Sequence, residues 1–296
     1  MTTSHHPVPN VGLRLWKRVE TRAAVRGSNI RQAFSLIEIL ITVALLSVII
    51  LGLVAMFNQV RRAFTSSITQ VDVLESGRAT SEMIARELEQ MVPASIPFTT
   101  NFYANVSFTP TVQPLNDPAD LRINVLEQVF FLTRYSQQWS GIGYRVSTPD
   151  LGYGTLYKYT SNNVPQANVP RAEGYFENTP LANMNRIAEG VVHFKVRAFD
   201  TNGILITASK NFITPEVNLL YRTTYPDLYD YTFTSNAVPA YLELELGILE
   251  ARTAERLKSL GGNAVISKDF ISKHAAQIHV FRQRISIRNV DPDAYK

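Results

Sequence analysis

The feature that most constrains this chain is a long apolar run that follows a basic segment and contains one carboxylate. Between residues 34 and 57 nearly every side chain is apolar, and Glu38 is the only charged one. About 20 apolar residues suffice to cross the hydrocarbon core of a bilayer. A charge inside such a span is costly and usually marks function. The sequence therefore predicts a membrane-spanning helix with a functional carboxylate near its start.

The motif Phe-Ser-Leu-Ile-Glu at residues 34–38 resembles the processing site of type IV prepilins and type II secretion pseudopilins. The resemblance implies that a prepilin peptidase cuts between Ala33 and Phe34 and that the new amino terminus is methylated. It also implies that Glu38 is the assembly residue, which neutralises the terminal amine of a neighbouring subunit. The chain departs from the family in having Ala33 where Gly usually precedes the cut, which bears on the efficiency of cleavage. Its leader is also longer than most.

Physical chemistry agrees with that role for Glu38. An ionised carboxylate in hydrocarbon costs at least ~2.5 kcal/mol on insertion scales. In the first turn of a helix, the positive helix end offsets part of this cost. An ammonium group at Phe34 of an adjacent subunit would offset more, because opposite charges attract strongly in a medium of low dielectric constant. The alternative is that Glu38 lies near the lipid headgroups of an ordinary signal anchor.

The basic character of the chain belongs to its leader. Residues 1–33 carry six basic residues and one acidic residue, a net charge of +5, whereas residues 34–296 carry 23 basic and 24 acidic residues, a net charge of −1. The basic pI is therefore not evidence of a nucleic-acid-binding surface on the body of the protein. Positive charge ahead of a span keeps that side in the cytoplasm. We expect a single-pass protein of the bacterial inner membrane, with a cytoplasmic leader and a periplasmic or extracellular body.

The chain has no cysteine, so we expect its exported part to be held by its own core rather than by disulfides. Many adhesive subunits of the resembled family carry a disulfide-bounded loop near the C-terminus. Its absence favours the pseudopilin side of the family.

The helical pattern continues beyond the membrane-spanning segment. Apolar residues recur at spacings of mostly three and four, which predicts an amphipathic helix with one face against a folded body. Pro93 disfavours helical geometry in the residue before it and predicts a helix end near Met91. Gly52 and Gly77 are expected weak points of this helix. The apolar positions of its second half are Val60, Phe64, Ile68, Val71, Leu74, Ile84, Leu88 and Met91.

The sequence beyond Pro93 is strand-like. Alternation of apolar and polar side chains is clearest in residues 191–199 and 241–249. One helix followed by mostly antiparallel strands is the α+β pattern, and it is also the pilin-like arrangement, with a long N-terminal helix packed on the sheet. Further strands are expected at 121–125, 129–134, 142–147, 155–160, 204–209 and 277–288, with a turn at 200–203, a bulge near Arg282 and a short helix at 251–260.

Four segments follow from these patterns. The leader (1–33) is removed on processing, the first half of the helix (34–59) spans the membrane and mediates assembly, the second half (60–92) is amphipathic, and the remainder (93–296) is an extracytoplasmic α+β domain. Within that domain, segments at 187–191, 239–249 and 280–285 are similar to the large minor pseudopilin called J and to related minor pilins.

Three tracts are expected to lie outside regular structure. Residues 94–118 predict a loop or an irregular strand, and residues 161–180 predict an exposed loop. Residues 221–236 are rich in Tyr and predict either a surface loop with aromatic tips or aromatic side chains folded back over the sheet. The Tyr-rich tract at 221–236 is a candidate contact surface, because Tyr is enriched at interfaces.

No catalytic motif stands out. The chain has no Cys nucleophile, no G-x-S-x-G elbow and no phosphate-binding glycine loop. His193 is expected to be exposed on the polar face of a strand, and Glu243 and Glu245 to lie on a solvated sheet face. Asp291 and Asp293 form an oxygen-rich tail and are candidate ligands for Ca²⁺. We otherwise expect no cofactor, no metal and no enzymatic activity.

These features predict a structural minor subunit of a type II secretion pseudopilus or a type IV pilus, since the body is bulky for a repeating shaft. The expected partners are other pilin or pseudopilin subunits, the prepilin peptidase and methyltransferase, the inner-membrane assembly platform and the membrane, with no nucleic acid. Two alternatives stay open. One is an adhesive pilus subunit whose loops at 161–180 and 221–236 contact a surface, and the other is an enzyme or binding domain on an uncleaved signal anchor.

Overall fold

The computed structural model describes residues 35–106, 110–114, 121–207, 216–221 and 228–295. The chain divides into two compact units, Met1–Gln59 and Val60–Lys296. Helix α1 (Leu36–Leu88) begins in the first unit and continues into the second. It ends at Leu88, three residues before the predicted end and well clear of Pro93.

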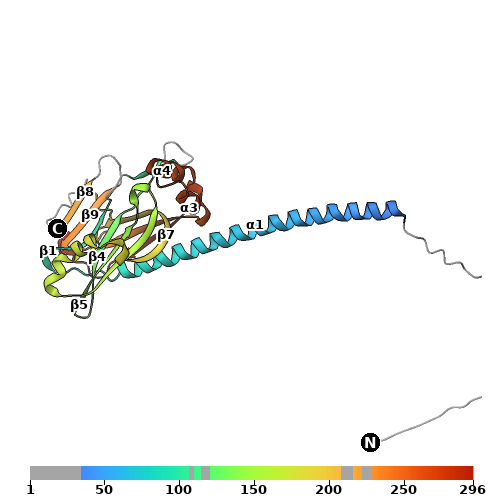
Figure 1. The fold of residues 1–296 in the computed structure, drawn as a ribbon. Coiled ribbons are helices and arrows are strands. Elements are labelled where there is room, and N and C mark those ends of the chain that lie inside the picture. The colour runs from blue at the N-terminus through green and yellow to red at the C-terminus, as the bar shows by residue number, and fades with distance from the viewer. Residues whose placement is uncertain (1–34, 107–109, 115–120, 208–215, 222–227, 296) are drawn as a thin grey trace, which may run out of the picture. The chain divides into compact units, whose positions relative to one another are not determined.

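The second unit is built on a large curled sheet of nine antiparallel strands (Figure 1). Their order across the sheet is β11-β10-β7-β6-β5-β4-β1-β9-β8, and β2 and β3 form a separate two-stranded sheet. The predicted α+β class, with a long N-terminal helix packed on an antiparallel sheet, is confirmed. The strands are β1 (Ile96–Asn105), β2 (Thr111–Pro114), β3 (Leu121–Asn124), β4 (Gln128–Tyr135), β5 (Gln138–Val146), β6 (Gly154–Val164), β7 (Asn185–Phe199), β8 (Val217–Tyr221), β9 (Tyr229–Ser235), β10 (Tyr241–Leu249) and β11 (Ile278–Ser286).

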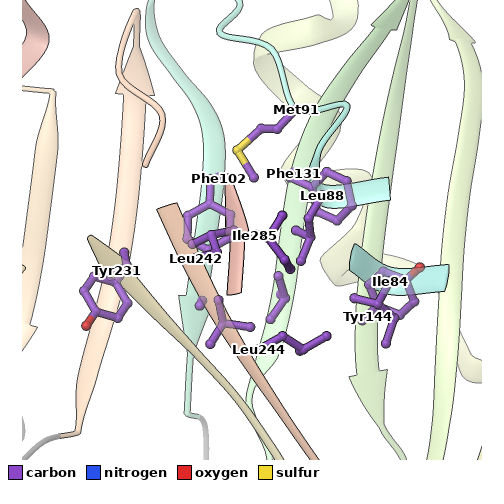
Figure 2. Close-up of a cluster of buried hydrophobic side chains, with 14 of the residues drawn as sticks. Ile84, Leu88, Met91, Phe102, Phe131, Tyr144, Tyr231, Leu242, Leu244 and Ile285 are labelled. Atoms are coloured by element: carbon purple, nitrogen blue, oxygen red, sulfur yellow. The ribbon is translucent and has the colours of Figure 1, made fainter. Parts of the chain in front are cut away.

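The last turns of α1 pack into the main hydrophobic core on the sheet. Ile84 and Leu88 are fully buried and lie beside Phe131 and Tyr144 of the sheet (Figure 2). The leucines of β10 enter the same core, as the alternation of residues 241–249 predicts. Burial of these side chains is the main force that holds α1 on the sheet.

A half-buried ion pair strengthens this contact. Glu87, near the end of α1, is bonded to Lys158 Nζ and to the Tyr144 hydroxyl, both from neighbouring strands. Gly77 is buried against the Phe281 ring of β11, which occupies the place where a β-carbon would lie. The predicted weak point of the helix is therefore a position of close packing, where the missing side chain makes room for an aromatic ring.

The apolar stripe of the second half of α1 divides into two parts, which differs from the prediction that all of it docks on the domain. Ile84, Leu88 and Met91 are buried. The five positions from Val60 to Leu74 are all at least 40% exposed, although the domain contacts α1 as early as Gln70 and Val73. They are Val60, Phe64, Ile68, Val71 and Leu74.

The opposite face of the sheet is covered by a short helical segment, and the expectation of an exposed loop at 161–180 is wrong. This segment comprises η2 (Gln166–Arg171) and α2 (Ala172–Asn178), followed by η3 (Leu181–Asn183). Val169, Ala172 and Phe176 are buried in a second hydrophobic cluster with Tyr103 and Phe130. The burial of these three apolar side chains holds an otherwise polar segment against the sheet.

Two other tracts contribute strands to the large sheet. Residues 94–118 contain β1, whose pairing with β9 shifts register twice, so the predicted irregular strand is present, and its side chains Phe102 and Tyr103 are buried on opposite faces of the sheet. Residues 107–109 and 115–118 of this tract lie outside the described residues. Of the tract at 221–236, residues 222–227 lie outside the described residues, and all the others except Leu228 and Asn236 belong to β8 and β9. Tyr231 and Phe233 of β9 are buried, so these aromatic side chains fold into the core.

The C-terminal part follows the prediction in outline. Helix α3 (Ala251–Lys258) lies within the predicted helix at 251–260, whereas α4 (Ala264–Lys273) was missed although Asn263 provides a good N-cap. The predicted bulge near Arg282 is wrong, because β11 pairs with β10 in one continuous register. The turn at 200–203 forms, but Leu205 makes only an isolated bridge with Phe199. The remaining short helices are η1 (Pro149–Leu151), η4 (Ala275–Gln277) and η5 (Pro292–Tyr295).

Candidate functional site

The start of α1 is capped by Ser35. Its hydroxyl oxygen lies 3.3 Å from the backbone nitrogen of Ile37, and its carbonyl accepts bonds from the N–H groups of Glu38 at 2.9 Å and Ile39 at 3.2 Å. Ser35 is therefore the N-cap, and Glu38 occupies the third helical position. A Ser followed three residues later by Glu is the capping-box pattern. The sequence alone led us to Glu38 but not to the capping role of Ser35, although the spacing of the two residues indicates it.

Glu38 is the only charge in a helical segment that is otherwise apolar or neutral. From Leu36 to Gln59 no other residue is charged, and the next charges are Arg61 and Arg62. An 18-residue window of α1 has a mean hydropathy of 3.0, and by length and composition the helix is able to cross a membrane. A carboxylate in the first turn lies at the positive end of the helix dipole. This is the arrangement that the sequence predicts for the assembly residue.

The two residues of the predicted cleavage site, Ala33 and Phe34, lie outside the described residues. Ser35 directly follows them and is the first residue of the described chain. If Phe34 is the mature amino terminus, its amine is one residue from the N-cap of α1 and four residues from Glu38. Processing at this bond would therefore place a new positive charge at the start of the helix.

Comparison with known protein families identifies this segment. Residues 28–54 match the family described as Prokaryotic N-terminal methylation motif. The matched range includes Ala33, Phe34 and Glu38 and the first part of α1. The prepilin-type motif and the one apolar helix found among the described residues together fit a membrane-anchored, single-pass protein. Neither the curated proteins nor the solved structures contain a match to the chain.

His193 and Glu245 form a buried pair, so the expectations of an exposed histidine and a solvated glutamate are wrong. His193 Nε2 lies 3.0 Å from Glu245 Oε2, and the two residues are 2% and 5% exposed. His193 Nδ1 accepts a hydrogen bond from the Val125 N–H at 3.1 Å, so Nε2 carries the proton and donates to Glu245. Arg282 Nη2 and Arg197 Nη2 approach Glu245 Oε1 at 2.8 and 3.7 Å.

The polar face of β7 and β10 is buried because β3, of the two-stranded sheet, packs against β7. Burial lowers the pKa of His193 and keeps the ring neutral. Burial alone would raise the pKa of Glu245, but the hydrogen bond from His193 and the charges of Arg197 and Arg282 hold it well below its usual range. The pair is thus a structural contact between β7 and β10, and both ring nitrogens of His193 are hydrogen-bonded.

Glu127 is a second buried carboxyl group. It is 1% exposed, and its Oε2 accepts a hydrogen bond from the Val196 N–H at 2.7 Å. The Glu127 N–H also donates to the Phe194 carbonyl of β7. The Glu127 side chain therefore extends this pairing with β7 by one further bond, at Val196. Burial raises the pKa of Glu127 to about 8, although Lys195 nearby lowers it in part.

Replacing Glu127 by Gln is expected to stabilise the fold at alkaline pH. The ordinary pKa of the carboxyl is 4.5, so between pH 4.5 and about 8 the folded chain holds a proton that the unfolded chain has lost. Stability then falls as the pH rises, by up to ~1.4 kcal/mol per unit, and the loss is complete above the folded-state pKa. Gln keeps an acceptor for Val196 and removes this dependence. Urea midpoints measured from pH 5 to 9 test it, and parallel curves for the two proteins would contradict a buried, protonated Glu127.

The calcium candidates at the C-terminus are engaged within the protein. Asp291 Oδ1 accepts a bond from the Asp293 N–H at 2.9 Å, and its Oδ2 accepts one from Asn236 Nδ2 at 2.7 Å. In the part of the chain that the structure describes, no group of three or more His, Asp or Glu side chains is arranged to hold a metal ion. The geometry at Asp291 is that of a polar link between the C-terminal segment and the end of β9.

Proposed function

We propose that this chain is a structural minor subunit of a type II secretion pseudopilus or a type IV pilus. The observation that supports this is the prepilin-type methylation motif at residues 28–54, which overlaps the capped start of an apolar helix. The fold supports it too, because a long N-terminal helix packed on an antiparallel sheet is the pilin-like arrangement. A minor role is proposed from the bulk of the domain, and likeness to the J-type pseudopilin is part of the same proposal.

The proposed mechanism begins with cleavage between Ala33 and Phe34 by a prepilin peptidase, which also methylates Phe34. The leader would be cytoplasmic and the domain periplasmic or extracellular, with α1 in the inner membrane. The subunit would then leave the bilayer through an inner-membrane assembly platform. In the filament, Glu38 would pair with the Phe34 amine of a neighbour, because a buried carboxylate needs an opposite charge close by.

The exposed half of the apolar stripe supports assembly through the helix. Val60, Phe64 and Ile68 lie on a part of α1 that the domain leaves uncovered. Large apolar side chains in a row on one helix face are stable in water only when another surface covers them. In the proposed filament, the helices of neighbouring subunits cover them.

The proposed role is structural rather than enzymatic. The titratable groups that sequence reasoning singled out, His193, Glu245 and Asp291, are each bonded to neighbouring groups of the fold. These bonds give each group a structural function. A signal-anchored enzyme and an adhesive subunit are the alternatives, and the first of them is separated by the following experiment.

Mass spectrometry of the N-terminal peptide is the test of processing. In chain extracted from membranes of a host with active prepilin peptidase, we expect a mature protein that begins at N-methylated Phe34. Ala33→Gly should be cut at least as completely, and Ala33→Leu should retain the leader, because the peptidase requires a small residue before the cut. A wild-type chain that keeps its leader in such cells would contradict the proposal and favour an uncleaved signal anchor.

A further inference from the structure

We propose that a corner between β1 and β9 binds an arginine side chain of a partner polypeptide. The corner is an open cavity of about 620 Å³, a volume within the range of ligand-binding pockets. It lies where β1, β9 and β8 neighbour one another at one side of the large sheet (Figure 1). The proposal goes beyond the proposed function and does not depend on it, because the whole corner belongs to the unit Val60–Lys296. We define the Phe98 corner by the lining residues Ser95, Phe98, Glu216, Ser235 and Asp291.

Phe98 is presented to solvent by an irregularity in β1. Ile96 pairs with Ser235 of β9 and Thr100 pairs with Thr234, so the residues between them on β1 have no partner on β9. Bulges of this kind re-aim a side chain and are common beside functional sites. Phe98 is 91% exposed, the largest exposed fraction among the large apolar residues of the described chain. The irregularity therefore places an aromatic ring in water instead of in the core.

Three residues of the corner have left-handed backbone geometry. Ser95, Phe98 and Ser235 have φ angles of 54°, 60° and 60°, and they are three of the six non-glycine residues with positive φ in the described chain. For a bulky residue such as Phe this conformation is a genuine outlier. Strained residues gather at binding and catalytic sites, where the surrounding structure holds them. An aromatic ring kept outside the core at a cost in backbone strain indicates a contact for that ring.

A fully buried side chain holds this strained backbone in place. Asn101 is 0% exposed, its Nδ2 donates to the Ser235 carbonyl at 2.9 Å, and its Oδ1 accepts a bond from the Ala94 N–H at 2.8 Å. The Ser95 N–H donates to the Ser235 carbonyl at 2.9 Å. The Phe98 N–H donates to the Ser235 hydroxyl oxygen at 3.2 Å. The corner is thus formed before any partner binds, which lowers the entropic cost of association.

The charges of the corner favour a cation that donates several hydrogen bonds. Among the described residues that line the cavity, Glu216 and Asp291 are acidic and none is basic. A cation over an aromatic face is attracted by the ring, and arginine is found there more often than lysine. The guanidinium group also donates hydrogen bonds in a fixed fork that matches carboxylate oxygens. An arginine side chain therefore uses both the exposed ring and the carboxylates.

The openness of the corner favours a polypeptide over a small free cation. The Phe98 ring stands almost wholly in solvent, so a lone guanidinium ion would leave most of it exposed. A polypeptide that carries an arginine covers the ring with its neighbouring atoms as well. Arginine and aromatic residues are enriched at protein interfaces and among the residues that contribute most to binding. The partner chemistry is therefore that of an arginine-containing segment of another protein.

Peptides of defined charge and shape test the proposal directly. Fluorescein-labelled tetra-arginine is the probe, and its anisotropy measures binding to the full chain in a neutral detergent at low salt. We expect tetra-lysine to bind at least about threefold more weakly, because its ammonium groups lack the planar fork. Tetra-citrulline, which has a similar shape without the charge, should not bind. Phe98→Gly should weaken the binding of tetra-arginine at least about fivefold, whereas Tyr135→Gly, at another exposed ring, should leave it unchanged.

Two further measurements separate binding from folding and from general charge. Phe98→Gly should not lower the urea midpoint, because glycine adopts a positive φ without steric cost. Glu216→Gln should weaken the binding of tetra-arginine at least about twofold, since a carboxylate beside the cation is lost. Glu255→Gln is the matched control, because it removes the same charge from a glutamate side chain that is 72% exposed on α3. It should leave the affinity unchanged.

The proposal would be overturned by a wild-type chain that does not bind tetra-arginine or that binds the three peptides equally. Equal weakening by Glu216→Gln and Glu255→Gln would overturn it as well, because binding would then follow overall charge. So would a Phe98→Gly variant that loses affinity and urea midpoint together, since the ring would then be part of the fold. None of these results bears on cleavage before Phe34, which mass spectrometry measures separately.

Discussion

Replacing Glu38 by Gln is expected to reduce incorporation into filaments at least tenfold while leaving cleavage before Phe34 intact. A Glu carboxylate about 4 Å from an ammonium group gains roughly 4 kcal/mol at an effective dielectric constant of 20. A tenfold change in an equilibrium corresponds to about 1.4 kcal/mol, so even a partly offset ion pair is sufficient. The amount of chain in sheared filaments, relative to processed chain in the membrane, measures the effect.

The capping box at the start of α1 makes this substitution informative. Gln serves as well as Glu at the third position of a capping box, so Glu38→Gln preserves the local helix start and removes only the charge. Ser35→Ala does the reverse, because it removes the cap and keeps the carboxylate. We expect Ser35→Ala to assemble nearly as wild type. Normal assembly of Glu38→Gln together with failure of Ser35→Ala would show that assembly requires the cap and not the charge.

The parts of the fold that sequence predicts well are those with local causes. The alternation in residues 191–199 and 241–249 defines β7 and β10, and Pro93 predicts the end of α1 to within three residues. The same local reasoning places Glu38 in the first turn of a helix. Each of these features depends on residues only a few positions apart, so a single sequence contains the whole signal.

The errors concern which surface is covered by another element. The alternation correctly put His193 and Glu245 on the face opposite the leucines of β10, but polar character suggested solvent there. The packing of β3 against β7 buries that face. The hydrogen bond between the two side chains, a second one from the Val125 N–H and the nearby guanidinium groups of two arginines compensate for the burial. A contact of this kind joins segments about 70 residues apart and leaves no local pattern. The burial of Phe176, in the helical segment that covers the opposite face of the sheet, was missed for the same reason.

The same argument explains the divided stripe on α1. Periodicity shows that one face of the helix is apolar, but it does not show what covers each part of that face. The structure buries the apolar positions of the last turns, with Leu88, in the domain, and it leaves the five stripe positions from Val60 to Leu74 exposed. The division is itself informative, since one continuous pattern serves two contacts: an internal one that stabilises the domain and, in the proposed function, one between subunits.

Replacing Leu88 by Ala is therefore expected to lower the free energy of unfolding by about 2–5 kcal/mol, the usual cost of truncating a fully buried leucine. Leu88 is 0% exposed and lies among Ile84, Phe131 and Tyr144, so the truncation leaves a cavity between the helix and the sheet. Urea unfolding of the full chain in detergent, with Trp16→Phe in every variant, measures the change. Trp139, which is 3% exposed and is the only tryptophan of residues 34–296, provides the fluorescence signal.

Leu74→Ala is the matched control, because it makes the same chemical change on the same helix at a residue that is 44% exposed. Its effect on unfolding should stay within about 0.5 kcal/mol, as for other surface substitutions. In filaments the order of the two effects should change: Leu74→Ala should weaken assembly of a fully folded subunit, whereas Leu88→Ala should act through loss of the fold. Equal destabilisation by both substitutions would mean that the domain covers α1 along its whole second half, and the exposed stripe would then no longer support contacts between subunits.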